Sequence, residues 1–390
     1  MGLAGKLSKW FQLWKNQFQL SKISNKKCEE NDSILIIKLD AIGDFIIWLD
    51  SAKEYRGIFP GKRLILLCSA LCKDIAKETG YFDEILQLDI SKCEKDHDYF
   101  KEKLALLSKQ PYGMVIQTTF SRTQHMDILA ATIPAYRKIG FVADESRSNV
   151  SRKLLSKRNK RILDSFYDEL IPTSKENLME IQRNKEFLLG LGKTDFKSGI
   201  PQLPHIMDVD TPSEKYFVVF PGASTRIKMW KTEYFAEVIN YIQGRRGWLC
   251  LVCGGKDEKP LFDLISERTD NNGKIENLCG KTTLTELIEI VRNSQMVISN
   301  DTSGIHYAAA TGVKGICPFG EYNYGRFLPY ESDQNDGTIK VCSAGMKCRN
   351  CSQKHMTLEC LRNVLITGRY LCLDKVSPED VINEVTKIIL

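Results

Sequence analysis

Short apolar runs alternate with helix-like patterns through the first half of the chain. Runs typical of buried strands lie at residues 34–39, 63–68, 84–90, 112–119 and 138–143. Between and after them, the spacing of apolar positions predicts helices at residues 45–58, 71–79, 94–109, 122–136 and 174–190. Strands that alternate with helices in this way predict a parallel, doubly wound α/β sheet with helices on both faces.

The second half of the chain repeats this alternation. Apolar runs at residues 216–224, 248–255, 295–299 and 314–320 predict strands. Helical patterns lie at residues 232–243, 258–268, 283–293 and 304–311. The C-terminal stretch begins with Ser377, Pro378 and Asp380, which form the pattern of a capping box with proline at the first helical position.

The two series predict two Rossmann-like domains that face each other across a cleft. The first domain is expected at residues 31–200 and the second at residues 216–390, and the linker at 201–215 has little periodicity. A chain of 390 residues agrees with two domains. Because ligands of open parallel sheets bind beyond the carboxyl ends of the strands, the loops at those ends are expected to carry the chemistry.

An amphipathic, basic segment at residues 1–30 precedes the first domain. Its apolar side chains recur at alternating spacings of three and four, and lysines flank them, as in Leu3, Leu7, Trp10, Phe11, Trp14 and Phe18 with Lys6, Lys9 and Lys15. Such a helix suits contact with the inner-membrane surface through residues 1–27. Packing against its own domain or against a partner protein fits the pattern equally well.

Composition narrows the class of protein. Hydrophobic content of 43% and charged content of 27% are ordinary for a soluble globular protein, and the sequence has neither a membrane-spanning run nor a signal-peptide pattern. We therefore expect a cytoplasmic protein. The net charge of +6 suits acidic small molecules or an anionic surface and falls short of a nucleic-acid-binding footprint.

Cysteines are numerous and scattered. Their count of 13 is odd, which favours reduced thiols over a disulfide framework. A Cys-rich segment covers residues 342–372, and Cys348 and Cys351 have the C-x-x-C spacing of a zinc hairpin that Cys360 and Cys372 would complete. Structural zinc and free thiols are both compatible with this pattern.

The segment QMVISNDTSGIHYAAATG predicts an anion site. A buried strand ends at Asn300-Asp301, and Thr302, Ser303 and Gly304 lead into a helix of small residues. The free N–H groups and the dipole at such a helix N-terminus attract phosphate. His306 falls in the first helical turn. The alternative is ordinary capping by Asp301 or Thr302, with His306 as a core residue.

A second strand-to-loop segment, FPGASTRIKMWK, places Ser224, Thr225 and Lys228 after an apolar run. A lysine beside small hydroxyl residues suits a diphosphate whose charge increases as a bond breaks, although a surface lysine would look the same. In the loop LVCGGKDE, Glu258 is placed either to bind a ribose or to lie in solvent. Neither segment has the Walker A or G-x-G-x-x-G pattern, which disfavours P-loop and NAD-binding proteins.

The stretch KLDAIGDFIIWLD places Asp44 directly after Gly43, between a strand-like run and an apolar helix pattern. A carboxylate there is either a helix cap or a catalytic base.

Three stretches, ILIIKLDAIGDFII, VVFPGASTRIKMW and MVISNDTSGIHYAAATGV, in this order and spacing, resemble the family 9 glycosyltransferases. These are the ADP-heptose:lipopolysaccharide heptosyltransferases and their relatives. The resemblance covers nearly everything from Ser33 to Leu390. It implies a GT-B fold with an N-terminal acceptor domain and a C-terminal nucleotide-sugar domain. It also implies an inverting, metal-independent transfer, with no cofactor, from a nucleotide sugar such as ADP-heptose to a lipid-linked glycan acceptor in lipopolysaccharide biosynthesis.

The same resemblance assigns roles to individual residues. It implies that Asp44 is the catalytic base and that Lys228 assists the leaving group. The residues it places around the donor are Gly43, Ser224, Thr225, Glu258, Asp301, Thr302, Ser303, Gly304 and His306. Two alternatives are a different GT-B nucleotide-sugar enzyme, such as a 2-epimerase, and a non-catalytic membrane-associated relative.

Overall fold

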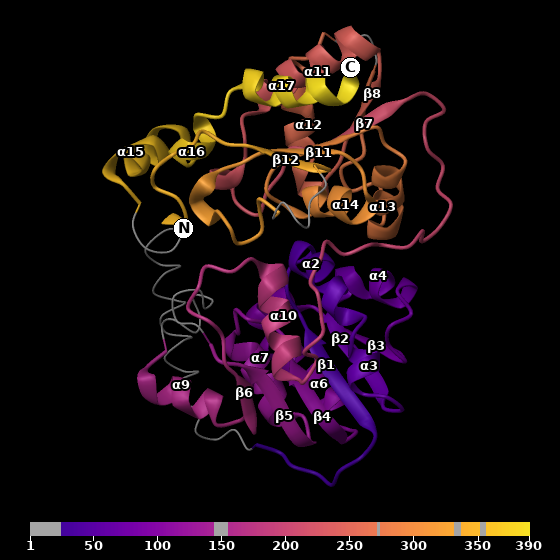
Figure 1. The fold of residues 1–390 in the computed structure, drawn as a ribbon, viewed down its shortest axis with the longest axis vertical. Helices are drawn as coiled ribbons and strands as arrows, with labels where there is room; N and C mark the ends of the chain where they lie inside the picture. The colour runs from indigo at the N-terminus through magenta and orange to yellow at the C-terminus, as the bar shows by residue number, and fades with distance from the viewer. Residues whose placement is uncertain (1–24, 144–154, 271–273, 331–336, 352–355) are drawn as a thin grey trace. The chain divides into compact units, whose positions relative to one another are not determined.

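The computed structural model describes residues 25–143, 155–270, 274–330, 337–351 and 356–390, and the chain forms two compact units (Figure 1). The first unit comprises Met1–Ala41, Ser51–Glu176 and Arg183–Lys197. The second comprises Ile42–Asp50, Asn177–Gln182 and Ser198–Leu390. Nearly all of the predicted amphipathic segment at 1–30 lies outside the described residues.

A six-stranded parallel sheet, in the order β3-β2-β1-β4-β5-β6, forms the centre of the first unit. Its strands are β1 (Ser33–Lys38), β2 (Arg63–Ser69), β3 (Glu84–Leu88), β4 (Tyr112–Gln117), β5 (Ala135–Phe141) and β6 (Glu169–Ile171). The helices along this part of the chain are α3 (Tyr55–Ile58), η2 (Ala70–Cys72), α4 (Lys73–Glu78), α5 (Ile90–Lys95), α6 (His97–Leu107), α7 (Gln124–Thr132), α9 (Lys157–Asp164) and α10 (Glu180–Gly190).

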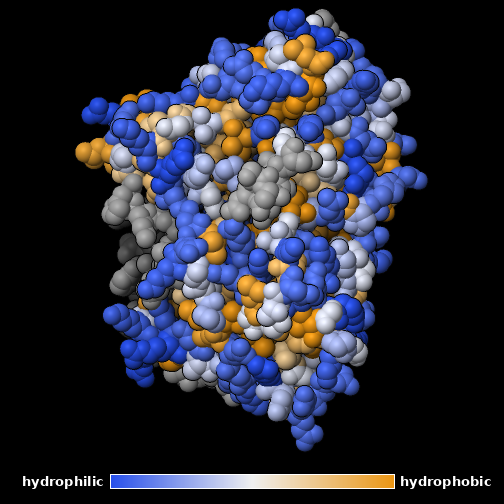
Figure 2. All heavy atoms as spheres, in the orientation of Figure 1, coloured by the Kyte–Doolittle hydropathy of each residue, from blue (hydrophilic) through white to orange (hydrophobic). Residues whose placement is uncertain are grey.

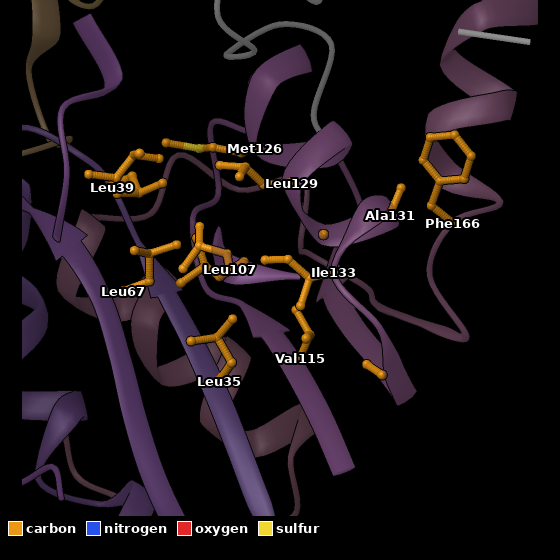
Figure 3. Close-up of a cluster of buried hydrophobic side chains, with 14 of the residues drawn as sticks. Leu35, Leu39, Leu67, Leu107, Val115, Met126, Leu129, Ala131, Ile133 and Phe166 are labelled. Carbon is orange, nitrogen blue, oxygen red and sulfur yellow. The ribbon is translucent and has the colours of Figure 1, made fainter. Parts of the chain in front are cut away.

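The central strands of this sheet are apolar because helices cover both of their faces. On one face, Leu35, Leu67 and Val115 point toward Met126 and Leu129 of α7 (Figure 3). These side chains belong to a single buried cluster, which is the hydrophobic core on that side of the sheet. The core thereby holds the carboxyl ends of β1 and β4 side by side.

The second unit contains another parallel six-stranded sheet, in the order β12-β11-β10-β7-β8-β9. Its strands are β7 (Tyr216–Phe220), β8 (Leu249–Val252), β9 (Ile275–Asn277), β10 (Val297–Ser299), β11 (Gly315–Pro318) and β12 (Ile339–Cys342). Its helices are α2 (Ile42–Ala52, as far as Asp50), η3 (Arg226–Lys228), α11 (Thr232–Arg246), η4 (Lys256–Glu258), α12 (Lys259–Ser266), α13 (Leu284–Arg292), α14 (Ser303–Thr311), η5 (Glu321–Asn323), α15 (Leu358–Thr367), α16 (Leu371–Asp374) and α17 (Pro378–Ile389).

Both sheets have the same doubly wound strand order, which confirms the predicted pair of Rossmann-like α/β sheets. In each sheet the order reverses between the first and fourth strands of the series, so β7 and β10 flank the reversal in the second sheet. The predicted capping box at the start of α17 is confirmed, with the Ser377 hydroxyl accepting from the Asp380 N–H and the Asp380 carboxylate accepting from the Ser377 N–H.

Polar and charged residues cover most of the face that Figure 2 shows, with smaller hydrophobic patches among them. Across the described part of the chain, no helix combines the length and the apolar character that crossing a bilayer requires.

Candidate active site

Two loops of the second unit meet where its strand order reverses. One loop follows β7 and the other follows β10, and in parallel sheets this position is where ligands bind. Asn300, which is fully buried, joins the two loops. Its side-chain N–H donates to the Pro221 carbonyl at 2.7 Å, and its side-chain oxygen accepts from the Trp230 N–H at 3.0 Å. The sequence analysis gave Asn300 no role, because nothing in the pattern shows which loop a buried amide will bridge.

Helix α14 begins at this junction. Thr302 occupies the N-cap position, but its side chain makes no capping hydrogen bond and lies instead 3.3 Å from the Ser299 hydroxyl. Thr302 therefore leaves the backbone N–H groups of the first turn uncapped, and together with the helix dipole they suit an anion. Gly304 has a packing function as well, because a Cβ there would lie 2.4 Å from the Phe220 ring.

Lys228 and Asp301 share one environment, built around Tyr322. The Lys228 ammonium lies 5.5 Å from the centre of the Tyr322 ring, and the Tyr322 hydroxyl donates to the Asp301 carboxylate at 3.4 Å. Burial raises the pKa of Asp301, while the positive charge of Lys228 opposes that shift. Tyr322 in turn stacks on Tyr370 with ring centres 4.7 Å apart. Tyr322 thus positions two predicted site residues, and it was absent from the predicted set because η5 follows β11, outside both motifs.

The Glu258 carboxylate lies between two glycines. A Cβ at position 222 would lie 1.6 Å from one Glu258 oxygen, and a Cβ at position 254 would lie 2.1 Å from the other. The Gly255 N–H donates to Glu258 at 2.7 Å, and burial raises the pKa of this carboxyl group. The structure therefore holds Glu258 against the loop that follows β7, rather than leaving it extended in solvent.

We expect Gly222→Ala to displace Glu258 and to raise the KM for the donor nucleotide about tenfold, since one charge-assisted hydrogen bond contributes about 1.5 kcal/mol or more. Gly255→Ala is the matched control, because a Cβ there would lie 3.9 Å from Glu258, an ordinary contact. Steady-state kinetics of the two variants would measure the difference. Equal KM values would show that the position of Glu258 does not matter for the donor.

Asp44 is the third residue of α2, within the first turn, and is half-buried. It therefore lies inside the helix rather than at the N-cap position. Directly before it, Gly43 approaches α14 closely, since a Cβ on Gly43 would lie 3.1 Å from the His306 ring and 3.7 Å from the Ser303 Cα. Within the second unit, the structure thus brings the start of α2 against the start of α14.

His306 is buried, and its Nδ1 forms a 2.7 Å hydrogen bond with the Tyr330 hydroxyl. Burial lowers the pKa of the imidazole to about 4, so the ring is neutral at pH 7. A neutral ring contributes shape and hydrogen bonding but no positive charge. Ser224 and Thr225 lie exposed on the loop after β7.

The lowered pKa of His306 makes a testable prediction about stability. His306 takes up a proton near pH 6.5 in the unfolded chain and only near pH 4 in the folded chain. The contribution of the neutral imidazole to the free energy of unfolding is therefore complete above about pH 6.5 and is lost as the pH falls to about 4. The full loss corresponds to about 3 kcal/mol. Urea unfolding at pH 7.5 and pH 5 should show that His306→Phe loses less stability on acidification than the wild type. An identical loss in both proteins would contradict the buried neutral state.

The four cysteines of the proposed zinc hairpin lie near one another, and none of them forms a disulfide. Burial raises the pKa of Cys372 to about 12, and the nearby Cys351 and Cys360 add to this shift. No group of three or more His, Cys, Asp or Glu side chains suited to a metal ion occurs within the described ranges. The zinc prediction thus has no support in the part of the chain that the structure covers.

Comparison with known proteins places this site in a family. The family model for Glycosyltransferase family 9 (heptosyltransferase) matches residues 128–361. The chain is similar to the Lipooligosaccharide heptosyltransferase 2 of Campylobacter jejuni, with 29% identity over 43% of this chain and 49% of that protein. The chain thus matches about half of the length of this curated relative.

The fold is similar to that of solved structures. A glycosyl transferase family 9 from Veillonella parvula superposes with a TM-score of 0.69 at 18% identity, covering 93% of this chain and 99% of that one. The E. coli heptosyltransferase WaaC with ADP-2-deoxy-2-fluoro heptose superposes with a TM-score of 0.59 at 17% identity, covering 86% of this chain and 99% of that one. These similarities confirm the predicted GT-B class of fold. Because the family model covers more than half of the 390 residues and the fold agrees, the chain belongs to glycosyltransferase family 9, the heptosyltransferase family.

Proposed function

We propose that this protein is an inverting, metal-independent glycosyltransferase that moves a sugar from a nucleotide sugar, ADP-heptose in the first instance, to a lipopolysaccharide core or a related cell-surface glycan. The observation that carries the proposal is the junction of the loops after β7 and β10. There Lys228, Asp301 and the N-terminus of α14 lie in one unit with Asp44.

The donor's diphosphate fits the N-terminus of α14, where backbone N–H groups and the hydroxyls of Thr302 and Ser303 supply donors. Lys228 adds a positive charge beside them. Ser224 and Thr225 add exposed hydroxyls from the loop after β7. In this proposal Glu258, which lies between Gly222 and Gly254, accepts hydrogen bonds from the ribose.

In the proposed transfer step, the negative charge of Asp44 and the positive charge of Lys228 have different functions. Asp44 accepts the proton of the acceptor hydroxyl while that oxygen attacks the anomeric carbon. The bond from the anomeric carbon to the phosphate oxygen breaks on the opposite face, and the nucleoside diphosphate leaves with the electron pair. Lys228 and the N-terminus of α14 stabilise the negative charge that develops on the leaving group. One displacement of this kind inverts the configuration of the sugar.

The names of similar proteins guide the choice of substrates. The C. jejuni relative is a lipooligosaccharide heptosyltransferase, and the E. coli structure contains an ADP-heptose analogue. We therefore propose ADP-heptose as the donor and a lipid-linked glycan as the acceptor, with the reaction at the cytoplasmic face of the inner membrane. Family membership favours transfer over 2-epimerisation or a non-catalytic function.

An assay with ADP-heptose and a lipid A–core acceptor tests the proposal by following both ADP release and the mass of the glycan. We expect ADP release only when the acceptor is present, with a gain of one heptose on the glycan. Consumption of the donor without an acceptor and with a new nucleotide-sugar isomer would instead indicate an epimerase. Binding of the donor without turnover on any core acceptor would contradict the proposed reaction.

A further inference from the structure

Helix α15 exposes a row of large apolar side chains. Leu358, Leu361, Leu365 and Ile366 are 85%, 45%, 79% and 76% exposed, respectively. The spacing of three and four places Leu358, Leu361 and Leu365 on one face of the helix. Cys360, by contrast, is buried, and α15 packs against α16. Figure 2 shows hydrophobic atoms at the margin of the view, where Figure 1 draws α15 in yellow.

This row differs from the other exposed apolar residues of the described chain. Met356 lies just before α15, and most of the others lie singly on other elements, for example Leu71 on η2, Leu106 on α6 and Leu264 on α12. Isolated apolar side chains are ordinary on protein surfaces, whereas a contiguous set with a polar border marks a docking surface. Ten residues of α15 supply four of these side chains.

The polar border of this surface is mainly basic. Arg362 is exposed on α15 itself. Arg226 lies at the C-terminal end of the helix, since a Cβ on Gly368 would be 3.6 Å from its Nε. Lys375 is 50% exposed and lies 3.8 Å from Glu359, which is the acidic residue of the helix. The apolar row is thus bordered by more positive than negative charge.

We propose that α15 docks on an anionic lipid surface. The leucines and Ile366 enter the boundary between headgroups and acyl chains, and Arg226, Arg362 and Lys375 contact the anionic headgroups. A second copy of the chain is a poorer occupant, because a two-fold interface across α15 would bring the same basic border against itself. This surface is separate from residues 1–27, and the proposal does not depend on the proposed enzymatic function.

Cosedimentation of the full chain with vesicles tests the proposal. The vesicles are phosphatidylcholine alone or phosphatidylcholine with phosphatidylglycerol. We expect wild type to bind the anionic vesicles, and Leu358→Ser/Leu365→Ser to bind them about tenfold more weakly, because two apolar anchors are lost. Leu71→Ser/Leu106→Ser is the control and should bind as wild type does. Arg362→Gln should weaken binding to anionic vesicles, and added salt should weaken wild-type binding.

Several outcomes would overturn the proposal. These are absence of wild-type binding, equal binding of the α15 double variant, and equal binding of wild type to neutral and anionic vesicles. A wild-type dimer in lipid-free solution that becomes monomeric in the α15 variant would identify a second copy as the occupant. Because the substituted leucines are exposed, thermal unfolding should be unchanged in the double variant, and Arg362→Gln provides an independent test that leaves the apolar row intact.

Discussion

Asp44→Asn is expected to lower kcat by about a hundred- to ten-thousand-fold while the KM for the donor changes little, because the substitution removes a general base and keeps the shape of the side chain. Asp44 lies in the first turn of α2, beside the close contact between Gly43 and His306. The loss should therefore concern proton transfer rather than donor binding. Initial rates over a range of donor and acceptor concentrations, with ADP release as the signal, would measure it.

Asp50→Asn is the matched control in the same helix. Asp50 is buried and accepts a 2.7 Å hydrogen bond from the Gly199 N–H, which is a structural contact. Asp50→Asn should lower the unfolding temperature and keep most of the kcat. Asp44→Asn should lower the kcat and leave the unfolding temperature nearly unchanged. Activity of Asp44→Asn within threefold of wild type would rule out Asp44 as the base and leave it only a favourable interaction with the helix dipole.

The fold was predictable because its central strands are apolar and its helices are amphipathic. Runs such as ILII in β1 and YFVVF in β7 are buried on both faces, which is the property that makes them conspicuous in a sequence. The edge strands β6, β9 and β12 have only three or four residues and contain polar side chains, as in IEN, so no run marked them. The single helix expected at residues 45–58 is two helices, α2 and α3.

The positions of the candidate site residues in the fold were predictable only where one motif contains them. Thr302, Ser303 and Gly304 follow a strand and begin a helix, so local pattern sufficed for their position. Contacts between distant segments were not predictable, since a sequence does not state which strands are neighbours. Asn300 bridges to the loop after β7, and Tyr322 reaches Asp301 from η5, and both contacts depend on the strand order of the sheet.

The cysteines show how little the spacing of residues alone specifies. The C-x-x-C spacing of Cys348 and Cys351 suggested a metal hairpin, yet no suitable group of ligands forms within the described residues. Spacing alone does not specify the direction in which the thiols point. Glu321 holds the backbone of this segment instead, by accepting hydrogen bonds from the Met346 N–H and from Arg349 Nε. The contacts of the segment are therefore those of a packed loop.

Lys228→Ala is expected to lower kcat by about a hundred- to a thousand-fold, equivalent to about 3 to 4 kcal/mol, if Lys228 stabilises the leaving diphosphate. Lys228→Arg should recover part of the rate, because the charge is retained while the geometry of the donors changes. Donor KM should rise less than kcat falls, because the charge on the leaving group is greatest in the transition state.

Lys231→Ala is the control that distinguishes stabilisation of the leaving group by Lys228 from a purely structural function of a lysine in this segment. Lys231 also contacts an aromatic ring, since its ammonium lies 4.5 Å from the centre of the Tyr234 ring, and it pairs with the Asp374 carboxylate at 3.1 Å. It comes only three residues later in the chain, on the far side of Trp230. If both lysines only stabilise the fold, Lys231→Ala should lower the stability at least as much as Lys228→Ala, and neither variant should lower kcat. A kcat effect confined to Lys228 would support leaving-group stabilisation, and equal effects in the two variants would exclude it.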